Sequence, residues 1–564
     1  MRSSPASDLP SAVSDRFLPK EFQGNVLRGS KVDPSKHPAV QKFYDAVQEI
    51  TPKSKLGTQA MAEDILGFLH IAHRDVLEGW LSNLELVTSP SQQTGRYLVS
   101  QQLSTSSTAF KASIHLESAN TKDPAGSIRA FGEYHQAGAS INPEDDGNLL
   151  QFFERVRNVF KAEPARFYLH AFLIHDNMLE LWIVDRSGAY SMGRLDIAAC
   201  PNLLVASLAG YTVMSDKELG FNTFIRRSKS EAQSYVTFNQ VDKLYLKAAL
   251  IASPAYVIGL GTTCYAASTS ITGEPSIVVK FSWHEDATPA EVGLLQLAQE
   301  RNVWGVVRLV GSQNLVSIDQ IREGLQFPRP AINRTLSCVA TTPLGRPMSK
   351  FNSIQELLEV FSDLVKALRS LYVDGRMLHR DVAIKNAVIT SQYGADSPKG
   401  VLIDFDQALD LDHARPVEPM VGSDGFMAIG ILSGKPHTYR HDLESLFYMF
   451  LWFAIGNDHE HDDANEILLG LPETSRLRKW CSMDFRSVGQ AKTADMGSDG
   501  FLEILGEFSE DFAPLKSLAK ELHALIFPIR DGEIFIGTET DSGAIEKLYQ
   551  GMIDAFDQAT VLLG

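Results

Sequence analysis

Three side chains near residue 380 have the types and the spacing that transfer of a phosphoryl group requires. Asp381 ends the run His-Arg-Asp, Asn386 comes five residues later, and Asp404 opens the run Asp-Phe-Asp. Such a reaction needs one carboxylate that faces the acceptor hydroxyl, and oxygen ligands that hold Mg²⁺ on the phosphates of ATP. We assign the first role to Asp381 and the second to Asn386 and Asp404, so the sequence predicts a phosphoryl-transfer site.

The segments on either side of these residues support this prediction. Apolar residues recur at helical spacing over 354–371, and Ser353 stands before them with a glutamate three residues further on, which predicts a helix with a capped start. Gly375 is expected to end this helix. The short apolar runs 387–389 and 401–403 predict a hairpin. The helix and the hairpin would hold the catalytic loop between them.

A loop of small residues earlier in the chain is a candidate nucleotide-binding loop. Gly259, Gly261 and Thr262 lie between apolar segments, and glycines let backbone amides approach the phosphates of ATP because no side chain intervenes. Cys264 stands where a third glycine would be expected. The alternative is an ordinary hairpin turn, since such a loop alone is weakly specific.

Lys280 supports the nucleotide-loop interpretation. It ends the valine-rich run 277–280, which predicts a strand, and a lysine placed there can reach the α- and β-phosphates. This lysine needs a glutamate partner on the next helix. Glu291 opens the helical run 291–298 and is our choice, with Glu300 as the second. The alternative is that Lys280 is a solvated strand end.

The composition limits the class of protein. The chain has 564 residues, and its hydrophobic content of 44% with 21% charged residues is ordinary for a soluble globular protein. The formal charge of −17 argues against binding to nucleic acid or anionic membranes. The four cysteines are widely separated, and the N-terminal residues show no secretory signal. We therefore expect an intracellular protein, cytoplasmic or nuclear, with no membrane partner.

Patterning along the chain predicts an α+β fold with five segments. They are a polar, partly ordered arm (1–57), an N-terminal α+β domain with a scaffold or regulatory role (58–215), an N-lobe (244–343), a C-lobe (344–530) and a C-terminal helix (540–564).

Within the N-terminal domain we expect two helices and a hairpin. Helical periodicity covers 60–87 and 148–162, and a segment rich in serine, threonine and glutamine, 88–108, reads as a long loop. The aromatic and β-branched runs 167–174 and 179–184, with turn residues between them, predict the hairpin.

The chain resembles the fungal-type protein kinase family, a divergent branch of the protein-kinase fold, over roughly residues 164–453. The motifs that carry the resemblance are Trp182-Ile-Val-Asp-Arg-Ser-Gly188, Leu378-His-Arg-Asp381 with Asn386, Ile403-Asp-Phe-Asp406, Phe426-Met-Ala-Ile429, and the long run from His437 to Leu446.

The resemblance implies a two-lobed kinase fold, Mg·ATP as cosubstrate, and phosphorylation of protein hydroxyls, for which we favour serine or threonine. It implies that Asp381 is the catalytic base, that Asn386 and Asp404 bind Mg²⁺, and that Lys280 pairs with the phosphates. Asp442 would be a buried acceptor that braces the catalytic loop.

Two departures from the kinase pattern and the composition of the activation segment carry predictions. Gly430 stands where protein kinases have the glutamate that closes the activation segment, so the usual ion pair with a later arginine is expected to be absent. Asp406 replaces the glycine of Asp-Phe-Gly, which restricts backbone rearrangement because a Cβ disfavours positive φ. Ser423 is the only hydroxyl between Asp404 and Gly430, so we predict activity that does not depend on phosphorylation of this segment.

Two other functions remain open at this point. A small-molecule phosphotransferase, of the aminoglycoside or choline kinase type, would use the acidic run 458–463 to line its acceptor pocket. A pseudokinase would use the front domain and the helix 544–562 as partner surfaces, although each catalytic role has an occupant.

Two weaker signals have ordinary explanations. The run 458–463 also contains metal-capable side chains, but a short polar run after an apolar helix is usually a solvated loop. In the front domain, Glu133 and His135 resemble part of the E-x-K motif of restriction-endonuclease-like folds, with histidine in place of lysine. We expect a scaffold there and not a nuclease.

Overall fold

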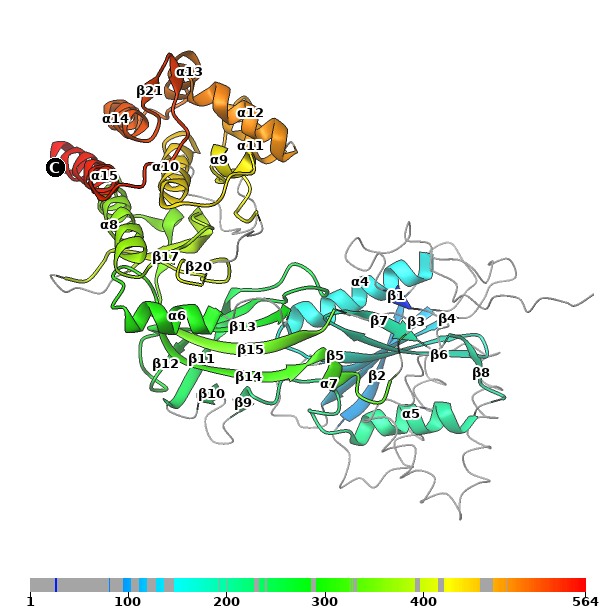
Figure 1. Ribbon diagram of the computed structural model, residues 1–564. Coiled ribbons are helices and arrows are strands. Elements are labelled where there is room, and N and C mark those ends of the chain that lie inside the picture. Colours follow the sequence, from blue (N-terminus) through cyan, green and yellow to red (C-terminus); the bar gives the residue numbers. More distant parts are fainter. Residues whose placement is uncertain are drawn as a thin grey trace, which may run out of the picture. The chain divides into compact units, whose positions relative to one another are not determined.

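We describe the fold from a computed structural model of the protein (Figure 1). Helices and strands both occur along the chain, in agreement with the predicted α+β class. Among the described residues, no helix is both long enough and apolar enough to cross a membrane. The structure describes residues 26–27, 81, 95–102, 111–118, 128–135, 147–191, 193–199, 201–227, 233–238, 241–285, 291–325, 327, 332–390, 396–413, 420–456, 470–482 and 484–563.

The chain forms two compact units. The first comprises Met1–Gly273, Val279–Thr288 and Gln313–Cys338, and the second comprises Glu274–Val278, Pro289–Ser312 and Val339–Gly564. The first unit therefore contains the front domain together with the loop that carries Gly259 and Gly261 and with the strand residue Lys280. The domain boundaries proposed from the sequence remain predictions.

A mixed sheet forms the front of the first unit, in the strand order β1-β7-β6-β5-β4-β3-β2, with β8 paired to β6. Strands β2, β3 and β4 form an antiparallel meander, and β5 pairs with β4 in parallel. The bounds are Val26–Leu27 (β1), Gly95–Gln102 (β2), Lys111–Ser118 (β3), Ile128–His135 (β4), Tyr168–His175 (β5), Met178–Asp185 (β6), Gly188–Ser191 (β7) and Leu195–Asp196 (β8).

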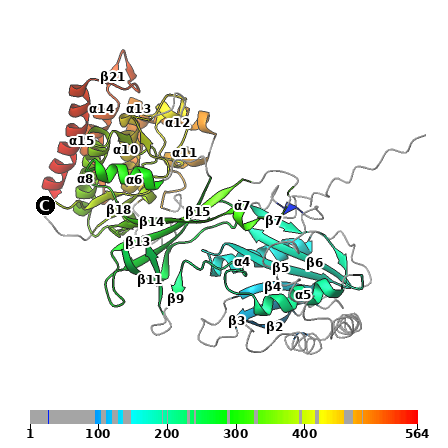
Figure 2. The same ribbon diagram turned by 60° about the horizontal axis from the view of Figure 1, so that its bottom comes forward.

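Two helices cover opposite faces of this sheet (Figures 1 and 2). Helix α4 (Gly147–Ala162) makes the crossover between the parallel strands β4 and β5, and its apolar side packs with Phe131, Leu169 and Trp182. Helix α5 (Pro201–Val213) packs with the alternate residues of the strands, such as Tyr134 and Phe172. Successive strand residues point to opposite faces, which is why the two cores are separate.

The predictions for the front domain are mostly confirmed where the structure describes it. Helix 148–162 is α4, and the predicted hairpin is formed by β5 and β6, with Asp176 in the turn at φ 52°. The long loop predicted over 88–108 is wrong, because β2 lies within it. Tyr97 and Val99 are buried there between exposed neighbours, an alternation that the polar composition obscured. Helix 60–87 falls outside the described residues except for Leu81, which is helical.

A second sheet is ordered β14-β15-β13-β12-β11-β10-β9. The strand predicted at 277–280 is the start of β13, so Lys280 lies on a central strand, and the helix predicted at 291–298 is α6 (Glu291–Glu300). The strand bounds are Arg226–Arg227 (β9), Ser234–Phe238 (β10), Val241–Ala252 (β11), Thr263–Ser268 (β12), Ile277–Glu285 (β13), Arg308–Ser317 (β14) and Arg334–Thr342 (β15), and the short helix α7 (Ile318–Ile321) follows β14.

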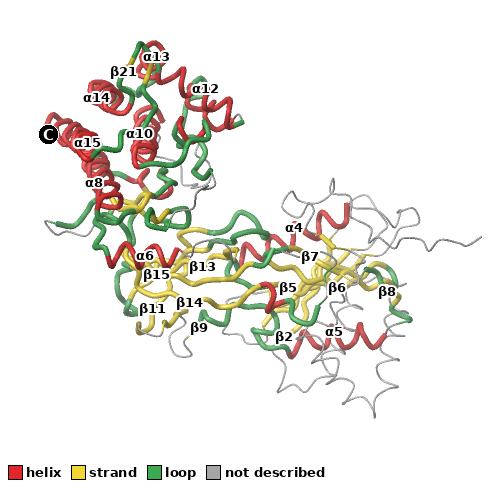
Figure 3. The backbone as a smooth tube through the Cα atoms, viewed as in Figure 1, coloured by secondary structure: helices red, strands yellow, loops and turns green. Residues whose placement is uncertain are grey.

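Most of the second unit is helical (Figure 3). Helix α8 (Ile354–Val373) is the predicted capped helix, since Ser353 Oγ accepts from Glu356 N, and it packs against α10 (Tyr439–Gly456) and α15 (Ser542–Leu563). The other helices are α9 (Ile429–Leu432), α11 (Lys479–Ser482), α12 (Phe485–Met496), α13 (Ser498–Gly506) and α14 (Lys516–Ile526), with 3₁₀ turns η5 (Met348–Lys350), η7 (Arg476–Arg478) and η8 (Ala513–Leu515).

Helix α15 is an integral part of the core of the second unit. The rings of Phe361 on α8 and Phe556 on α15 stack with centroids 5.4 Å apart, and Ser362 Oγ donates to Asp557 at 2.6 Å. The C-terminal helix predicted at 540–564 is confirmed. Its buried residues pack against α8 and α14.

Short strands enclose the loops that carry the site. The predicted hairpin is β18 (Ala387–Ile389) paired with β19 (Gly400–Leu402), and β17 (Met377–Leu378) pairs with β20 (Leu409–Asp410). The 3₁₀ turn η6 (Ile384–Asn386) leads into β18. The remaining short strands are β16 (Arg346–Pro347), β21 (Ile529–Arg530) and β22 (Glu533–Ile534).

Candidate active site

The carboxylate of Asp381 is held by neighbours on both of its oxygens. Its Oδ1 accepts a hydrogen bond from Ser423 Oγ at 2.6 Å, and its Oδ2 accepts one from Asn386 Nδ2 at 2.8 Å. Lys385 Nζ lies 3.8 Å from Oδ2. Asp381 is only 9% exposed, so these contacts fix the direction in which the carboxylate points. A fixed carboxylate is what a general base needs before a substrate arrives.

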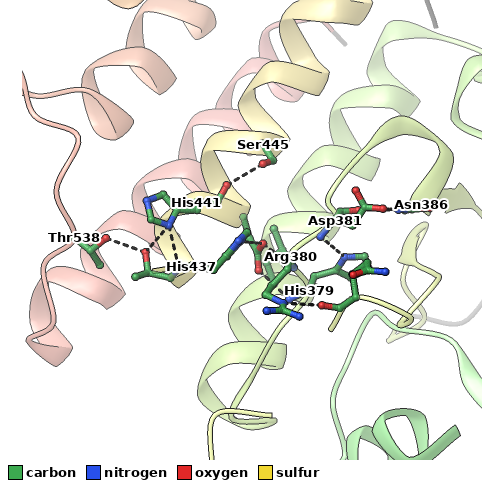
Figure 4. A network of polar contacts seen from close by, with 12 residues as sticks. His379, Arg380, Asp381, Asn386, His437, His441, Ser445 and Thr538 are labelled. Carbon is green, nitrogen blue, oxygen red and sulfur yellow. Dashed lines mark hydrogen bonds and ion pairs between the residues drawn. The ribbon is translucent and has the colours of Figure 1, made fainter. Parts of the chain in front are cut away.

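The main chain that leads to Asp381 is braced by a buried aspartate, Asp442. Figure 4 shows His379, Arg380 and His437, which contact it, together with Asp381. Asp442, near the start of α10, accepts from His379 N at 2.9 Å and from Arg380 N at 3.0 Å, and His437 Nε2 lies 2.8 Å from it. Burial opposes the charge, but His437 and the hydrogen bonds outweigh it and hold the pKa of Asp442 below its ordinary value. The brace implied by the resemblance is therefore confirmed.

Two site residues adopt a backbone conformation that is unfavourable for residues with a Cβ. Arg380 has φ 64° and Asp404 has φ 65°. Such a conformation costs roughly 1–3 kcal/mol and persists only where the surroundings impose it. Arg380 Nε donates to Gln407 O at 2.7 Å, and His379 Nε2 lies 3.0 Å from Ile403 O. These bonds tie the catalytic loop to the segment around Asp404.

Three carboxylates of the second unit meet beside Phe405. One carboxylate oxygen from each of Glu291, Asp404 and Asp406 lies within 4.8 Å of the others, and Phe405 N donates to Glu291 Oε1 at 3.3 Å. Carboxylate oxygens are the ligands that Mg²⁺ prefers, and a divalent cation would relieve the repulsion among three negative charges. The donor set therefore fits a magnesium ion.

Asn386 and Asp404 were the metal ligands expected from the sequence. The amide nitrogen of Asn386 donates to the main-chain oxygen and the carboxylate of Asp381, so only its amide oxygen can bind a cation. Asp406 was treated only as a replacement for glycine, yet its carboxylate joins the cluster. A carboxylate two residues after Asp404 was the sequence signal that could have indicated this.

The glycine loop and Lys280 lie in the first unit. Gly259 and Gly261 have φ 122° and 54°, values that favour glycine, and Thr262 Oγ1 lies 3.0 Å from Ser282 Oγ. Lys280 is partly exposed on β13. The pairing of Lys280 with Glu291 remains a prediction.

The end of the activation segment is anchored without the closing glutamate of other kinases. Glu444 of α10 accepts from Ile429 N at 2.7 Å and pairs with Arg440 at 3.0 Å, with both side chains buried. Gly430 cannot be a glutamate here, because a Cβ at this position would lie 2.3 Å from His441 Nε2. Glu444 of α10 therefore supplies the anchor that a glutamate at position 430 would otherwise provide.

A buried lysine supplies a second anchor for the same segment. Lys492 of α12 donates to Gly425 O at 2.8 Å and to Met427 O at 2.7 Å, and it lies over the Tyr448 ring at 4.0 Å. Burial lowers the pKa of Lys492 to about 7. Sequence reasoning missed Glu444 and Lys492. Glu444 stands in the run from His437 to Leu446 that we had marked as distinctive, whereas nothing around Lys492 marks it.

Two acidic residues of the activation segment, Asp410 and Asp412, have arginine partners. Asp412 accepts from Arg301 at 3.0 Å and from Arg376 at 3.2 Å, and Arg301 also lies 3.5 Å from Asp410. The single hydroxyl of the segment, Ser423, is buried against Asp381. These contacts form without a phosphate group.

Among the described residues, the nuclease-like signal of the front domain has no metal cluster around it. Arg155 Nη1 lies 3.0 Å from Glu133 Oε1, and His135 Nε2 lies 2.7 Å from Glu133 Oε2, so both oxygens of this carboxylate have side-chain neighbours. Within the described part of the chain, the carboxylates of Glu291, Asp404 and Asp406 form the only cluster suited to a metal. The run 458–463 lies outside the described residues.

The second sheet and the braced catalytic loop are typical of kinases, the enzymes that transfer the γ-phosphate of ATP. A family model described as fungal protein kinase matches residues 108–454, which is more than half of the chain, so the protein belongs to the fungal protein kinase family. A search of curated proteins found no match. Membership confirms the resemblance seen in the motifs and supports a phosphotransferase activity.

Proposed function

We propose that the protein is an ATP-dependent protein kinase that transfers the γ-phosphate of Mg·ATP to a serine or threonine hydroxyl of a protein substrate. The observation that carries this proposal is the carboxylate of Asp381, held on one oxygen by Ser423 and on the other by Asn386. A base that is already oriented does not have to be ordered during the reaction.

Asp381 is proposed to accept the proton of the substrate hydroxyl as the oxygen attacks the γ-phosphorus. The bond from the γ-phosphorus to the β–γ bridging oxygen then breaks and ADP leaves. Asp404 and the amide oxygen of Asn386 would hold Mg²⁺ on the phosphates, and the carboxylate of Asp406 lies close enough to that of Asp404 to share this role. Bound Mg²⁺ supplies charge neutralisation at the phosphate oxygens. Lys280 would pair with the α- and β-phosphates and Glu291 would position it.

We further propose the two-lobed kinase arrangement for residues 244–530, an intracellular location, and partners limited to ATP and a protein substrate, without nucleic acid or membrane. The sheet order of β11 to β15, with a glycine loop before β12 and a lysine on β13, supports the N-lobe assignment. The small-molecule alternative rests on the Asp-Phe-Asp motif and on the missing closing glutamate. The acidic run 458–463, which would line its acceptor pocket, lies outside the described residues.

The test is phosphate transfer by the purified full chain. Radiolabelled Mg·ATP is supplied with generic protein acceptors and with small amino alcohols, and the labelled amino acid is identified after hydrolysis. Asp381→Asn keeps the size of the side chain and removes the base, so we expect transfer to protein to fall by about 10²-fold or more. Label found only on the small amino alcohols would show a small-molecule phosphotransferase and not a protein kinase. Equal transfer by wild type and by Asp381→Asn would contradict a catalytic role for Asp381.

A further inference from the structure

The motif Trp182-Ile-Val-Asp-Arg-Ser-Gly188 has no role in the site described so far, although it is among the most distinctive parts of the sequence. It lies at the end of β6 and in the turn to β7, in the front sheet. The same turn contacts the loop that carries Gly259 and Gly261, and all of these residues belong to the first unit. The contacts are polar and buried.

Arg186 is the centre of this contact. It is fully buried, and its Nη1 donates to Val257 O at 2.9 Å and to Tyr256 O at 3.3 Å, while its Nη2 donates to Pro164 O. The guanidinium carbon also lies 4.9 Å from the centre of the Phe160 ring. A buried arginine of this kind is retained only where fixed acceptors compensate for its lost hydration. Two of those acceptors are carbonyls at the start of the glycine loop.

The main chain of Arg186 holds the loop at a second point. Gly259 N donates to Arg186 O at 3.0 Å. A Cβ at Gly261 would lie 3.0 Å from the guanidinium carbon, so the charged group packs directly against this glycine. Because the amide of Gly259 is already used, contacts to phosphate fall to the later amides of the loop.

Arg186 is itself fixed by the residues on either side of it. Asp185 is fully buried and accepts from Arg322 Nε and Nη2, each at 2.7 Å, and it also accepts from Ser187 N at 2.8 Å. Arg334 Nη1 donates to Ser187 Oγ at 3.0 Å. A two-point arginine–carboxylate pair fixes orientation as well as distance. The turn is therefore rigid where it meets the glycine loop.

We propose that Arg186 is a positioning residue through which the front domain holds the glycine loop in the conformation that binds the phosphates of a nucleoside triphosphate. This inference rests on the proposed kinase function and adds a role for the front domain. Holding a loop in its bound conformation strengthens binding because less ordering is left to occur when the ligand arrives. Loss of Arg186 should therefore weaken the binding of ATP and leave the rate of phosphate transfer nearly unchanged.

The chain offers a matched control in Arg166. It is equally buried, and it donates to four carbonyls of the same unit, those of Tyr168, Ile128, Arg129 and Leu219, none of which belongs to the glycine loop. Replacing either arginine with lysine keeps the charge and removes the fork of donors. Both substitutions should destabilise the protein, but only Arg186→Lys should loosen the glycine loop.

The experiment compares wild type, Arg186→Lys and Arg166→Lys as full chains. Calorimetry with a non-hydrolysable ATP analogue and Mg²⁺ gives Kd, thermal melting gives the loss of stability, and hydrogen exchange without nucleotide reports on residues 256–262. We expect Arg186→Lys to raise Kd by about tenfold, which corresponds to about 1.4 kcal/mol. Exchange in the loop should rise and, in the transfer assay, the KM for ATP should rise with little change in kcat. Arg166→Lys should leave Kd and loop exchange unchanged.

An Arg186→Lys protein that is folded and binds the analogue as tightly as wild type would overturn the positioning role while leaving the kinase proposal intact. An equal rise in Kd in Arg166→Lys would also overturn it, because general loss of stability would then suffice. Wild type that does not bind the analogue would overturn the nucleotide site itself. If Arg186→Lys does not fold, Asp185→Asn keeps the side-chain shape and weakens the pair with Arg322, and the same rise in Kd is expected.

Discussion

Ser423 is placed to hold the carboxylate of Asp381, the proposed catalytic base. Ser423 is the single hydroxyl side chain of the activation segment, and the sequence predicts activity that does not depend on phosphorylation of this segment. In the structure it is 9% exposed and donates to Asp381 at 2.6 Å. A phosphate on Ser423 would place negative charge against the catalytic carboxylate. Modification there is expected to inhibit.

Three substitutions at Ser423 test this interpretation. Ser423→Ala removes a hydrogen bond to a charged group, worth about 1.5–3 kcal/mol, so kcat should fall by roughly 10- to 100-fold. Ser423→Thr keeps the hydroxyl and should retain most of the activity. Ser423→Asp should be inactive, because two carboxylates would face each other. The measurement is kcat with a protein acceptor. Loss in Ser423→Ala that Ser423→Asp restores would instead show that the enzyme requires phosphorylation at this position.

Among the elements, helix α10 organises both sides of the candidate site. All but the last of its 18 residues are buried, so it has no solvated face. Asp442 points to the catalytic loop and Glu444 to the end of the activation segment. His441 lies between them, with Nδ1 accepting from Thr438 N at 3.0 Å, which places its proton on the Nε2 that faces Gly430.

The burial of His441 makes stability depend on pH. Burial, with the charges of His437 and Arg440, lowers the pKa of His441 to about 3 from 6.5. Between these values the unfolded chain binds a proton that the folded protein excludes, so the free energy of unfolding falls as pH falls, by about 1.4 kcal/mol per unit from this group. The loss begins below pH 6.5 and ends near pH 3.

Urea unfolding of wild type and His441→Asn at pH 7.5 and 5.5 tests this. Asparagine offers an oxygen in place of Nδ1 and does not titrate. Between pH 7.5 and pH 5.5, the free energy of unfolding of the His441→Asn protein should fall by about 1.4 kcal/mol less than that of wild type. Equal decreases in the two proteins would assign the acid sensitivity to other groups.

For the whole molecule, most of the described front domain lies within the region that the fungal protein kinase family model matches. The family match begins at residue 108, so it includes β3 to β8 with α4 and α5. The front sheet shares one compact unit with the glycine loop. The C-terminal part beyond residue 454 lies outside the match, yet its last helix completes the core of the second unit.

Nucleotide binding should stabilise the folded protein in a magnesium-dependent way. Ligand at 100 times its Kd adds about 2.7 kcal/mol of stability, which raises the melting temperature measurably. We expect ATP with Mg²⁺ to stabilise wild type more than ATP with excess chelator does. Asp404→Asn should lose most of this magnesium effect because the cluster loses a charge. An equal shift with and without Mg²⁺ in wild type would contradict a metal site formed by these carboxylates.

The sequence by itself determined the parts of this protein that depend on near neighbours. The capped helix before the catalytic loop, the hairpin β18–β19, the strand with Lys280 and the helix from Glu291 follow from periodicity and turn residues within a few positions. The motif around Asp381 also indicated its chemistry. Strand β2 was missed because its polar composition concealed a short alternation.

Only the tertiary structure decided which distant residues meet. Ser423 and Asp381 are 42 positions apart, Lys492 and Gly425 are 67 apart, and Arg186 and Val257 are 71 apart. No local pattern encodes such pairs, because they depend on how complete elements pack and on which buried polar groups then require partners. The same packing explains why Gly430 replaces a glutamate, since His441 already fills that space.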